Sequence, residues 1–234
     1  MKDFRLKLIF IVSFLFSISC TNNKNTAINI LYLFDISGSY HKKSLKESLE
    51  ISSEIFNEII GSNGVPFKPQ THQVSTIESM SVSIGGNCYT RIIQDNIFDE
   101  QKSNPTQQFE NCLKKIHTSK PTNATDLKGA LATASKTLQN DELRGKGVII
   151  FSDLHESLNT KRSYPINLEN VCVYVIYEWS DYQIANPQLI TEDENSFREL
   201  LIQSGVNPND IEMKNISTVA TNPEMVSNWF RKKF

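Results

Sequence analysis

The stretch that decides the fold is residues 28–39, which read INILYLFDISGS. Its first part, Ile28–Phe34, is a nearly continuous apolar run with the length of one strand. Runs of this kind are typical of strands buried on both faces, as in a parallel sheet that helices cover on each side. Directly after the run come Asp35, Ser37 and Ser39, so a carboxylate and two hydroxyls follow the predicted strand.

Two further apolar runs, Val148–Phe151 and Val171–Tyr177, predict two more buried strands of the same kind. Between the predicted strands, apolar residues recur on one helical face. They are Leu45, Leu49, Phe56 and Ile60 in one segment and Leu127, Leu131, Ala134 and Leu138 in another. This alternation predicts an α/β fold with a doubly wound, mostly parallel sheet flanked by helices. Alternating residues between Gln73 and Ile84 predict an antiparallel strand at the edge of that sheet.

Further elements are predicted in the remaining segments. A short helix is expected before Pro121, and the C-terminal part is expected to add a helix, a strand and a last helix. The supporting residues are Phe109, Leu113 and Ile116; Phe197, Leu200 and Leu201 with Gly205 as the stop; Ile211–Ile216; and Trp229 with Phe230 after an Asn222-Pro223 helix start. We expect Trp229 and Phe230 to pack in the core.

The N-terminal segment Met1–Ser19 has the pattern of an export signal, with a basic start and then an apolar run. That run is shorter than the roughly 20 residues of a transmembrane helix. It ends in small residues and Cys20, which resembles the lipobox of bacterial lipoproteins. The resemblance implies cleavage before Cys20 and lipidation of its sulfur; an ordinary secretory signal and an uncleaved anchor helix are the alternatives. Residues 20–26 are then the lipidated cysteine and a linker, and residues 27–234 form the folded domain.

Cysteine usage and charge are consistent with an exported protein. With Cys20 lipidated, three cysteines remain, so at most one intramolecular disulfide can form. A bridge between Cys88 and Cys112 stays open against two free thiols, whereas Cys172 lies in an apolar run and is predicted to be buried and inert. In lipoproteins of enterobacteria, an aspartate directly after the lipidated cysteine favours retention in the inner membrane. Thr21 occupies that position here, so the sequence favours the outer membrane. The formal net charge of -2, with both signs mixed along the chain, argues against nucleic-acid binding.

Two more polar positions match the pattern that begins at Asp35. Asp153 follows the second apolar run, and Thr125 stands at the start of the helix predicted from Leu127. An Asp-x-Ser-x-Ser after the first strand, a threonine that opens a helix and an aspartate that ends a later strand closely resemble the von Willebrand factor A family. In that family these residues form the metal-ion-dependent adhesion site.

The resemblance implies a role for each matched residue. Ser37 and Ser39 would bind a metal through their hydroxyls, Thr125 directly or through water, and Asp35 and Asp153 mainly through bridging waters. Oxygen ligands suit a hard cation, Mg²⁺ first, with Mn²⁺ or Ca²⁺ as alternatives. Because neutral hydroxyls leave the charge of the cation poorly neutralised, it attracts an acidic residue of a partner protein.

The resemblance covers residues 27–180 as the core, with residues 181–234 as a C-terminal extension. The sequence departs from the family at Leu154, where glycine usually follows the aspartate, and at Ala124, where glycine often precedes the threonine. Neither departure removes an oxygen ligand.

Three functions are open on these grounds. The first is a non-enzymatic module, anchored to the membrane by its lipid, that binds a cation and a protein partner. The second is a metal-dependent hydrolase or phosphatase, against which stands the lack of an Asp-x-Asp pair, a Gly-x-Ser-x-Gly elbow or a histidine-rich cluster. The third is a structural envelope lipoprotein with a non-functional site. His41 and His155 are expected to face solvent, with a place near the site as the alternative.

Overall fold

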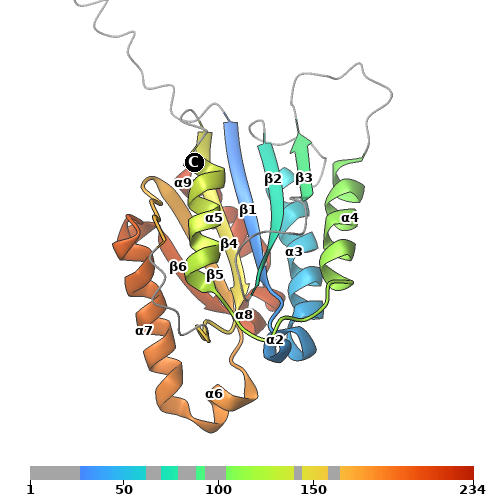
Figure 1. Cartoon of the computed structure of the whole chain (residues 1–234). Coiled ribbons are helices and arrows are strands. Elements are labelled where there is room, and N and C mark those ends of the chain that lie inside the picture. Colours follow the sequence, from blue (N-terminus) through green and yellow to red (C-terminus); the bar gives the residue numbers. More distant parts are fainter. Residues whose placement is uncertain (1–26, 62–69, 79–87, 93–103, 140–143, 158–163) are drawn as a thin grey trace, which may run out of the picture.

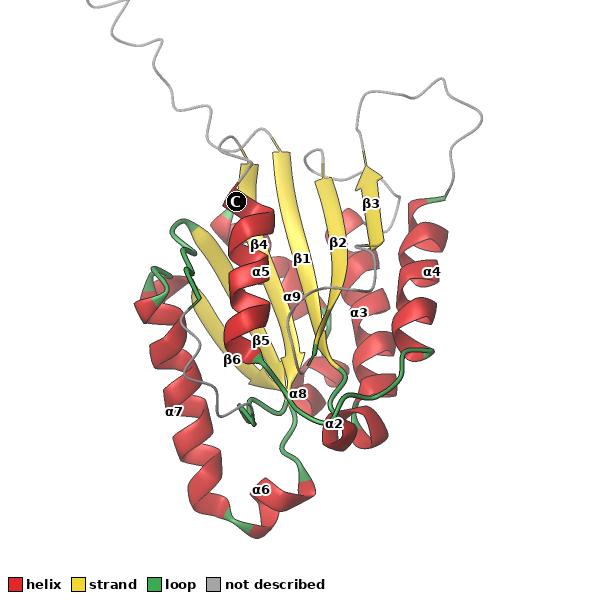
Figure 2. Cartoon of the chain, in the orientation of Figure 1, coloured by secondary structure: helices red, strands yellow, loops and turns green. Residues whose placement is uncertain are grey.

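The computed structural model describes residues 27–61, 70–78, 88–92, 104–139, 144–157 and 164–234. The predicted signal segment and Cys20 lie outside the described residues, as do residues 79–87 of the predicted edge region. Figure 1 and Figure 2 show a sheet with helices on both of its faces. Within the described ranges no helix is both long and apolar enough to cross a bilayer.

Six strands of the described residues form one sheet in the order β3-β2-β1-β4-β5-β6. They are β1 Ala27–Asp35, β2 Gln70–Ile77, β3 Cys88–Ile92, β4 Arg144–Ser152, β5 Val171–Tyr177 and β6 Ile211–Asn215. β2, β1, β4, β5 and β6 run parallel to one another. The short strand β3 pairs antiparallel with β2. The predicted α/β class and mostly parallel sheet are confirmed.

The prediction of an edge strand is wrong for residues 73–77, and residues 79–84 lie outside the described residues. β2 ends at Ile77 and pairs along its length with β1, so it is an interior strand. Its polar residues do not mark a solvent face, because His72 and Ser75 are buried. Buried polar side chains in β2 therefore mimic the alternation of a half-exposed strand.

Helices cover both faces of the sheet. They are α2 Gly38–Lys43, α3 Leu45–Ile60, α4 Pro105–His117, α5 Leu127–Gln139, α6 Asp181–Ala185, α7 Pro187–Gln203, α8 Ile216–Thr221 and α9 Glu224–Lys233, with a short 3-10 turn at Pro208–Asp210. Apolar residues of α5 and α7 pack on one face, and those of α3, α4, α8 and α9 pack on the other. The helices predicted in these segments are confirmed.

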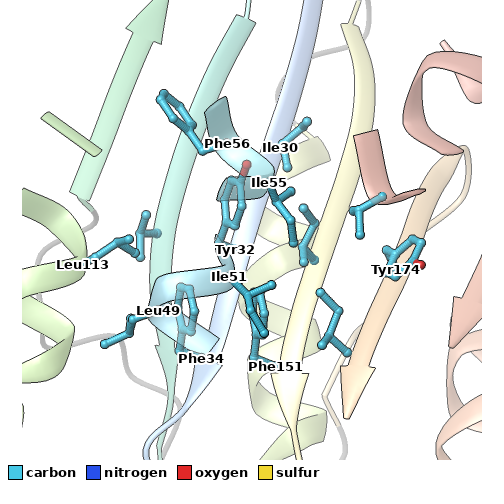
Figure 3. Packing of buried hydrophobic residues seen from close by; sticks show 14 of the residues in the cluster. Ile30, Tyr32, Phe34, Leu49, Ile51, Ile55, Phe56, Leu113, Phe151 and Tyr174 are labelled. Carbon is cyan, nitrogen blue, oxygen red and sulfur yellow. The ribbon is translucent and has the colours of Figure 1, made fainter. Parts of the chain in front are cut away.

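Successive residues of β1 point to opposite faces, as the pleat of a strand requires. Ile30, Tyr32 and Phe34 pack in the cluster beneath α3, where Figure 3 shows them beside residues of that helix. Leu31 and Leu33 pack in the cluster beneath α5 and α7. Both faces of β1 are therefore buried, which explains its continuous apolar run.

Residues 181–234 belong to the same sheet and core. β6 pairs with β5, and Phe230 is buried with Trp229 packed beside it, as predicted. Asn222, in contrast, ends α8 instead of starting the last helix, because its N–H donates to the carbonyl of Val219. The last helix begins at Glu224.

The order of the strands places a crevice at the end of β1. From β1 the chain crosses to β2 and the sheet edge, then returns to the other side of β1 with β4. The connection that leaves β1 passes through α3 on one face of the sheet, whereas the connection that leads into β4 passes through α5 on the other face. Ligands of doubly wound sheets bind at such switch points. Asp35 ends β1 and Asp153 directly follows β4.

Candidate metal centre

The carboxylate of Asp35 is held at the base of the crevice. Its Oδ1 accepts the N–H of Ser37 at 2.8 Å, and its Oδ2 accepts the hydroxyl of Ser152 at 2.7 Å. The side chain has no exposed surface. Two neighbouring strands, β1 and β4, therefore fix the orientation of this carboxylate.

Three further predicted residues come together in front of Asp35. The hydroxyl of Ser39 donates to Asp153 Oδ2 at 3.2 Å, and the hydroxyl oxygens of Ser37 and Ser39 lie 3.5 Å apart. The other oxygen of Asp153, Oδ1, accepts the N–H of His155 at 3.1 Å. Residues far apart in sequence thus bring their oxygens to one place.

Thr125 reaches the same place on a loop that pairs with the loop after β1. The N–H of Gly38 donates to the carbonyl of Thr122 at 2.9 Å, and the N–H of Thr122 donates to the carbonyl of Ile36 at 2.9 Å. The N–H of Thr125 donates to the hydroxyl of Ser157 at 2.7 Å. These bonds position the threonine ahead of α5.

A pocket of about 360 Å³ opens over these side chains. Its lining residues are Ser37, Gly38, Ser39, Thr122, Asn123, Ala124, Thr125, Asp153, His155 and Ser157. Asp35 lies behind this wall and bonds to the N–H of Ser37. Four of the five predicted ligands therefore face one pocket, and the fifth supports it.

Burial and mutual repulsion disfavour the charged forms of the two carboxylates. Burial, and then the charge of Asp153, raises the pKa of Asp35 to about 7. Burial also raises the pKa of Asp153. Among the described residues neither carboxylate forms an ion pair with lysine or arginine. Buried charges are costly without a partner, so a cation in this pocket would stabilise both carboxylates.

Phe34 and Phe151 pack against each other just before the ends of β1 and β4. They are partners in the register of β1 and β4, and each directly precedes a residue of the site. Their rings stack with centroids 4.7 Å apart and planes inclined by 6°. The stack holds the ends of both strands together beneath the carboxylates.

Leu154 keeps the backbone conformation that glycine favours. Its φ is 63°, in the left-handed region, where a residue with a side chain costs about 1–2 kcal/mol. The Leu154 side chain is buried in the core beneath α5 and α7, which contributes about 1.5–3 kcal/mol. The departure from glycine therefore leaves the loop geometry after Asp153 intact.

The expectation that the histidines face solvent holds only in part. His155 is half-buried and lines the pocket, and its Nδ1 donates to Asp193 Oδ2 at 3.0 Å. The reason is that α7 lies beside the loop after β4 and supplies that carboxylate. His41 is also half-buried, and its Nε2 has no partner among the described residues.

Sequence reasoning missed two supporting residues. The hydroxyl of Ser152 donates to Asp35 and accepts the N–H of Leu154 at 3.0 Å. Gln183 Nε2 donates to the carbonyl of Asp153 at 2.8 Å. Ser152 could have been found from its place beside Asp153, whereas nothing in the sequence near Gln183 indicates its role.

Two of the cysteine predictions can be compared with the structure. Cys172 is buried and free, as predicted. Cys112 takes part in a disulfide bond. The side chain of Cys88 lies outside the described part of the chain, so the Cys88–Cys112 pair stays a prediction.

Among the described residues no three of histidine, cysteine, aspartate and glutamate gather as a metal-binding group. The candidate centre therefore relies on hydroxyls together with carboxylates. That donor set differs from the histidine- and carboxylate-rich sites of most metallohydrolases.

Comparison with known proteins identifies the fold. No family model and no curated protein matches the chain. A von Willebrand factor type A structure from Catenulispora acidiphila matches with a TM-score of 0.55 and 12% identity, over 86% of this chain and 42% of that one. The vWF domain of the type V pili tip protein Mfa5 from Porphyromonas gingivalis matches with a TM-score of 0.55 and 8% identity, over 89% of this chain and 96% of that one.

The pilus adhesin SpaC from Lactobacillus rhamnosus GG, in its open conformation, matches with a TM-score of 0.53 and 11% identity, over 92% of this chain and 31% of that one. The chain thus spans less than half the length of the Catenulispora and Lactobacillus structures. At these identities the similarity defines the fold. Residues 27–234 contain a von Willebrand factor A-like domain, and this part of the predicted resemblance is confirmed.

Proposed function

We propose that this chain is a non-enzymatic module that holds a divalent cation, Mg²⁺ above all, and uses it to bind a protein partner. A lipid on Cys20 tethers the module to the bacterial cell envelope, in the outer membrane. The observation that carries the proposal is the pocket that Ser37, Ser39, Thr125 and Asp153 line in front of buried Asp35.

The residues of the pocket fit a hard cation. Hydroxyl and carboxylate oxygens are the ligands that Mg²⁺ prefers in proteins. Ser37, Ser39 and Thr125 would hold it with their hydroxyls, and Asp35 and Asp153 through water. Two buried carboxylates without a lysine or arginine partner among the described residues supply the attraction. When bound, the cation supplies a positive charge that draws the carboxylate of a partner.

The similar structures support protein binding over hydrolysis. Mfa5 is described as a pilus tip protein and SpaC as a pilus adhesin. The pocket is formed by loops at one end of the sheet, where a side chain of another protein can reach its hydroxyl groups. We therefore place this chain among binding modules.

Isothermal titration calorimetry with MgCl₂ and MnCl₂ tests the cation. The protein is the chain from residue 20 onward with Cys20→Ser, so that no lipid is attached. We expect one site, with affinity lowered at least about tenfold in Asp35→Asn and in Ser39→Ala. Absence of binding, or equal affinity in both variants, would refute the proposal.

Asp126→Asn is the matched control for Asp35→Asn. Asp126 is equally buried, and its Oδ1 accepts the N–H of Gly129 at 2.8 Å at the start of α5. Asparagine caps a helix about as well as aspartate. This variant should therefore keep the affinity for Mg²⁺.

The lipid and the partner need separate tests. Labelling of cells with an alkyne-modified palmitate should mark the wild-type protein and leave Cys20→Ser unmarked. Crosslinked co-purification from the envelope should recover a partner in Mg²⁺ and lose it when a chelator is added. A wild-type protein without label contradicts the anchor, and a partner that the chelator leaves bound contradicts the role of the metal.

A further inference from the structure

A short arm, residues 178–186, projects beyond the carboxyl ends of the strands (Figure 1). It lies at the same end of the molecule as the loops after β1 and β4, which carry the candidate metal ligands and which we call the metal loops. We refer to it as the α6 arm, because it contains α6. Two large apolar side chains of the arm face solvent, Tyr182 at 62% exposure and Ile184 at 54%. They are the most exposed large apolar residues in the described part of the chain, and they lie two residues apart.

The α6 arm is fixed to the metal loop by a buried glutamine. Ser180 and Gln183 form a capping box at the start of α6. The side chain of Gln183 is fully buried, and its Nε2 donates to the carbonyl of Asp153 at 2.8 Å and to Asp193 Oδ2 at 2.8 Å. The arm therefore has a defined position relative to the candidate metal ligand Asp153.

A lysine from the other side of the crevice adds a second tie. Lys43 Nζ donates to the carbonyl of Trp179 at 3.0 Å and to Asp181 Oδ1 at 3.1 Å. Because these contacts order the arm before any partner arrives, its apolar side chains are presented at little further entropic cost.

The exposed patch begins next to the pocket. His155 lines the pocket, and its ring centroid lies 6.3 Å from that of Tyr182. One ring therefore separates the candidate metal centre from the apolar surface. An extended peptide advances about 3.3 Å per residue, so about two to four residues span this step.

Charge narrows the choice of partner. The α6 arm and the start of α7, residues 178–195, contain five acidic residues and no basic one. Glu178 and Asp181 lie beside Lys43. Asp193 lies beside His155. Glu192 and Glu194 have no basic partner among the described residues, so this side of the arm is negative. Like charges across an interface are unfavourable, so the segment that lies along the arm is neutral or basic apart from the acid at the metal. The same negative charge disfavours the anionic surface of a membrane.

We propose that Tyr182 forms the apolar half of the partner site. The partner is a protein segment with one acidic residue and a large apolar side chain two to four positions away, in an otherwise neutral or basic context. This inference rests on the proposed metal-dependent binding: the acid reaches the cation while the apolar side chain packs on the α6 arm.

Fluorescence anisotropy with three synthetic peptides tests the inference. The first has Asp and Phe three positions apart in a background of Gly, Ser and Lys; the second has Ser in place of Phe; the third has Asn in place of Asp. In 5 mM Mg²⁺ we expect the first to bind about tenfold more tightly than the second, as burial of one large apolar side chain predicts. The third peptide, and all three in EDTA, should bind at least tenfold more weakly than the first.

Tyr182→Ser should remove the advantage of the Phe peptide. Its control is Ile202→Ser, which changes an apolar residue of α7 that is 40% exposed and should leave that advantage intact. Calorimetry on both variants shows whether Mg²⁺ is still held.

The outcomes separate this inference from the proposed function. If Mg²⁺ does not bind, both fail. If Mg²⁺ binds, the inference alone is overturned when no peptide binds, when the first two peptides bind equally, or when Tyr182→Ser keeps the preference. Tyr182-dependent sedimentation of the protein with phosphatidylcholine vesicles would also overturn it, because the patch would then belong to a lipid surface.

Discussion

Two clusters of buried polar side chains in the described part of this sheet can be compared. They differ in whether the protein itself supplies a partner for every polar or charged group. The first, in β1 and β2, centres on His72. The Tyr32 hydroxyl lies 3.2 Å from His72 Nδ1, and His72 Nε2 lies 2.8 Å from Gln70 Oε1. Burial lowers the pKa of His72 to about 3, so the ring is neutral and each of its nitrogens has a partner.

The second cluster, Asp35 with Asp153, is not complete. Serine hydroxyls and backbone N–H groups bond the carboxylates, yet no lysine or arginine of the described residues pairs with them. The comparison teaches that burial of a polar group does not by itself indicate function. A neutral cluster with satisfied hydrogen bonds stabilises the fold, whereas buried charge without a counter-charge indicates a binding site.

The largest expected effect is the stabilisation of the folded protein by a cation. The cation would supply the positive charge that the cluster of Asp35 and Asp153 lacks and so remove the difference between the two clusters. A cation that binds only the folded state stabilises it by about 2.7 kcal/mol at a concentration of 100 times Kd. For a domain of this size that raises the Tm by about 5 to 10 °C. Thermal melts in MgCl₂ and in EDTA should show the full shift in the wild type and in His72→Gln, and at most about half of it in Asp35→Asn, whose affinity is at least about tenfold lower. A wild-type Tm that ignores Mg²⁺ would contradict the comparison.

The next effect is the loss of folding stability that the His72 cluster causes at acid pH. The pKa of His72 is about 6.5 when unfolded and about 3 when folded, so between these values the unfolded state binds more protons. Stability due to this group is present above pH 6.5 and is lost as the pH falls, by about 2 kcal/mol between pH 7 and pH 5. Urea unfolding at both pH values should show that His72→Gln loses about 2 kcal/mol less than the wild type. Equal losses would mean that His72 is not a neutral buried base.

The smallest effect belongs to an exposed pair and sharpens the contrast with both buried clusters. Lys43 and Asp181 are 3.1 Å apart, but the Asp181 side chain is 92% exposed. Exposed ion pairs contribute about 0–1 kcal/mol. Lys43→Met should lower the free energy of unfolding by less than about 1 kcal/mol in urea titrations and leave the Mg²⁺ shift unchanged. A larger loss would show that the α6 arm contributes to global stability.

The fold and the candidate ligands were predictable because local patterns encode them. The apolar run of β1 can lie only in a sheet covered on both faces, and Asp35, Ser37 and Ser39 follow it directly. Since parallel strands end at one edge, Asp153 after β4 had to lie near Asp35. In both cases the sequence neighbours of each residue carry the information.

The errors share a different cause, because they concern polar side chains whose partners are distant in sequence. Residues 73–77 looked like part of an exposed strand, yet Ser75 is buried and β2 pairs along its whole length with β1, which is distant in sequence. His155 looked solvent-facing because its partner Asp193 comes from α7, and Gln183 carries no local sign of its bond to Asp153. Tertiary placement decides such pairs, and hydropathy patterns do not record it.

The central strand also gives the molecule a polarity. β1 starts at Ala27 and ends at Asp35, so the point where the chain enters the domain lies about 30 Å from the metal loops, at the opposite pole of the sheet (Figure 1). The Phe234 ring lies against Gly145 near the start of β4, so the C-terminus shares the entry pole. A lipid on Cys20 would therefore place the membrane at the end of the domain where β1 starts. The candidate metal centre would then face away from the bilayer, toward molecules that arrive from the far side.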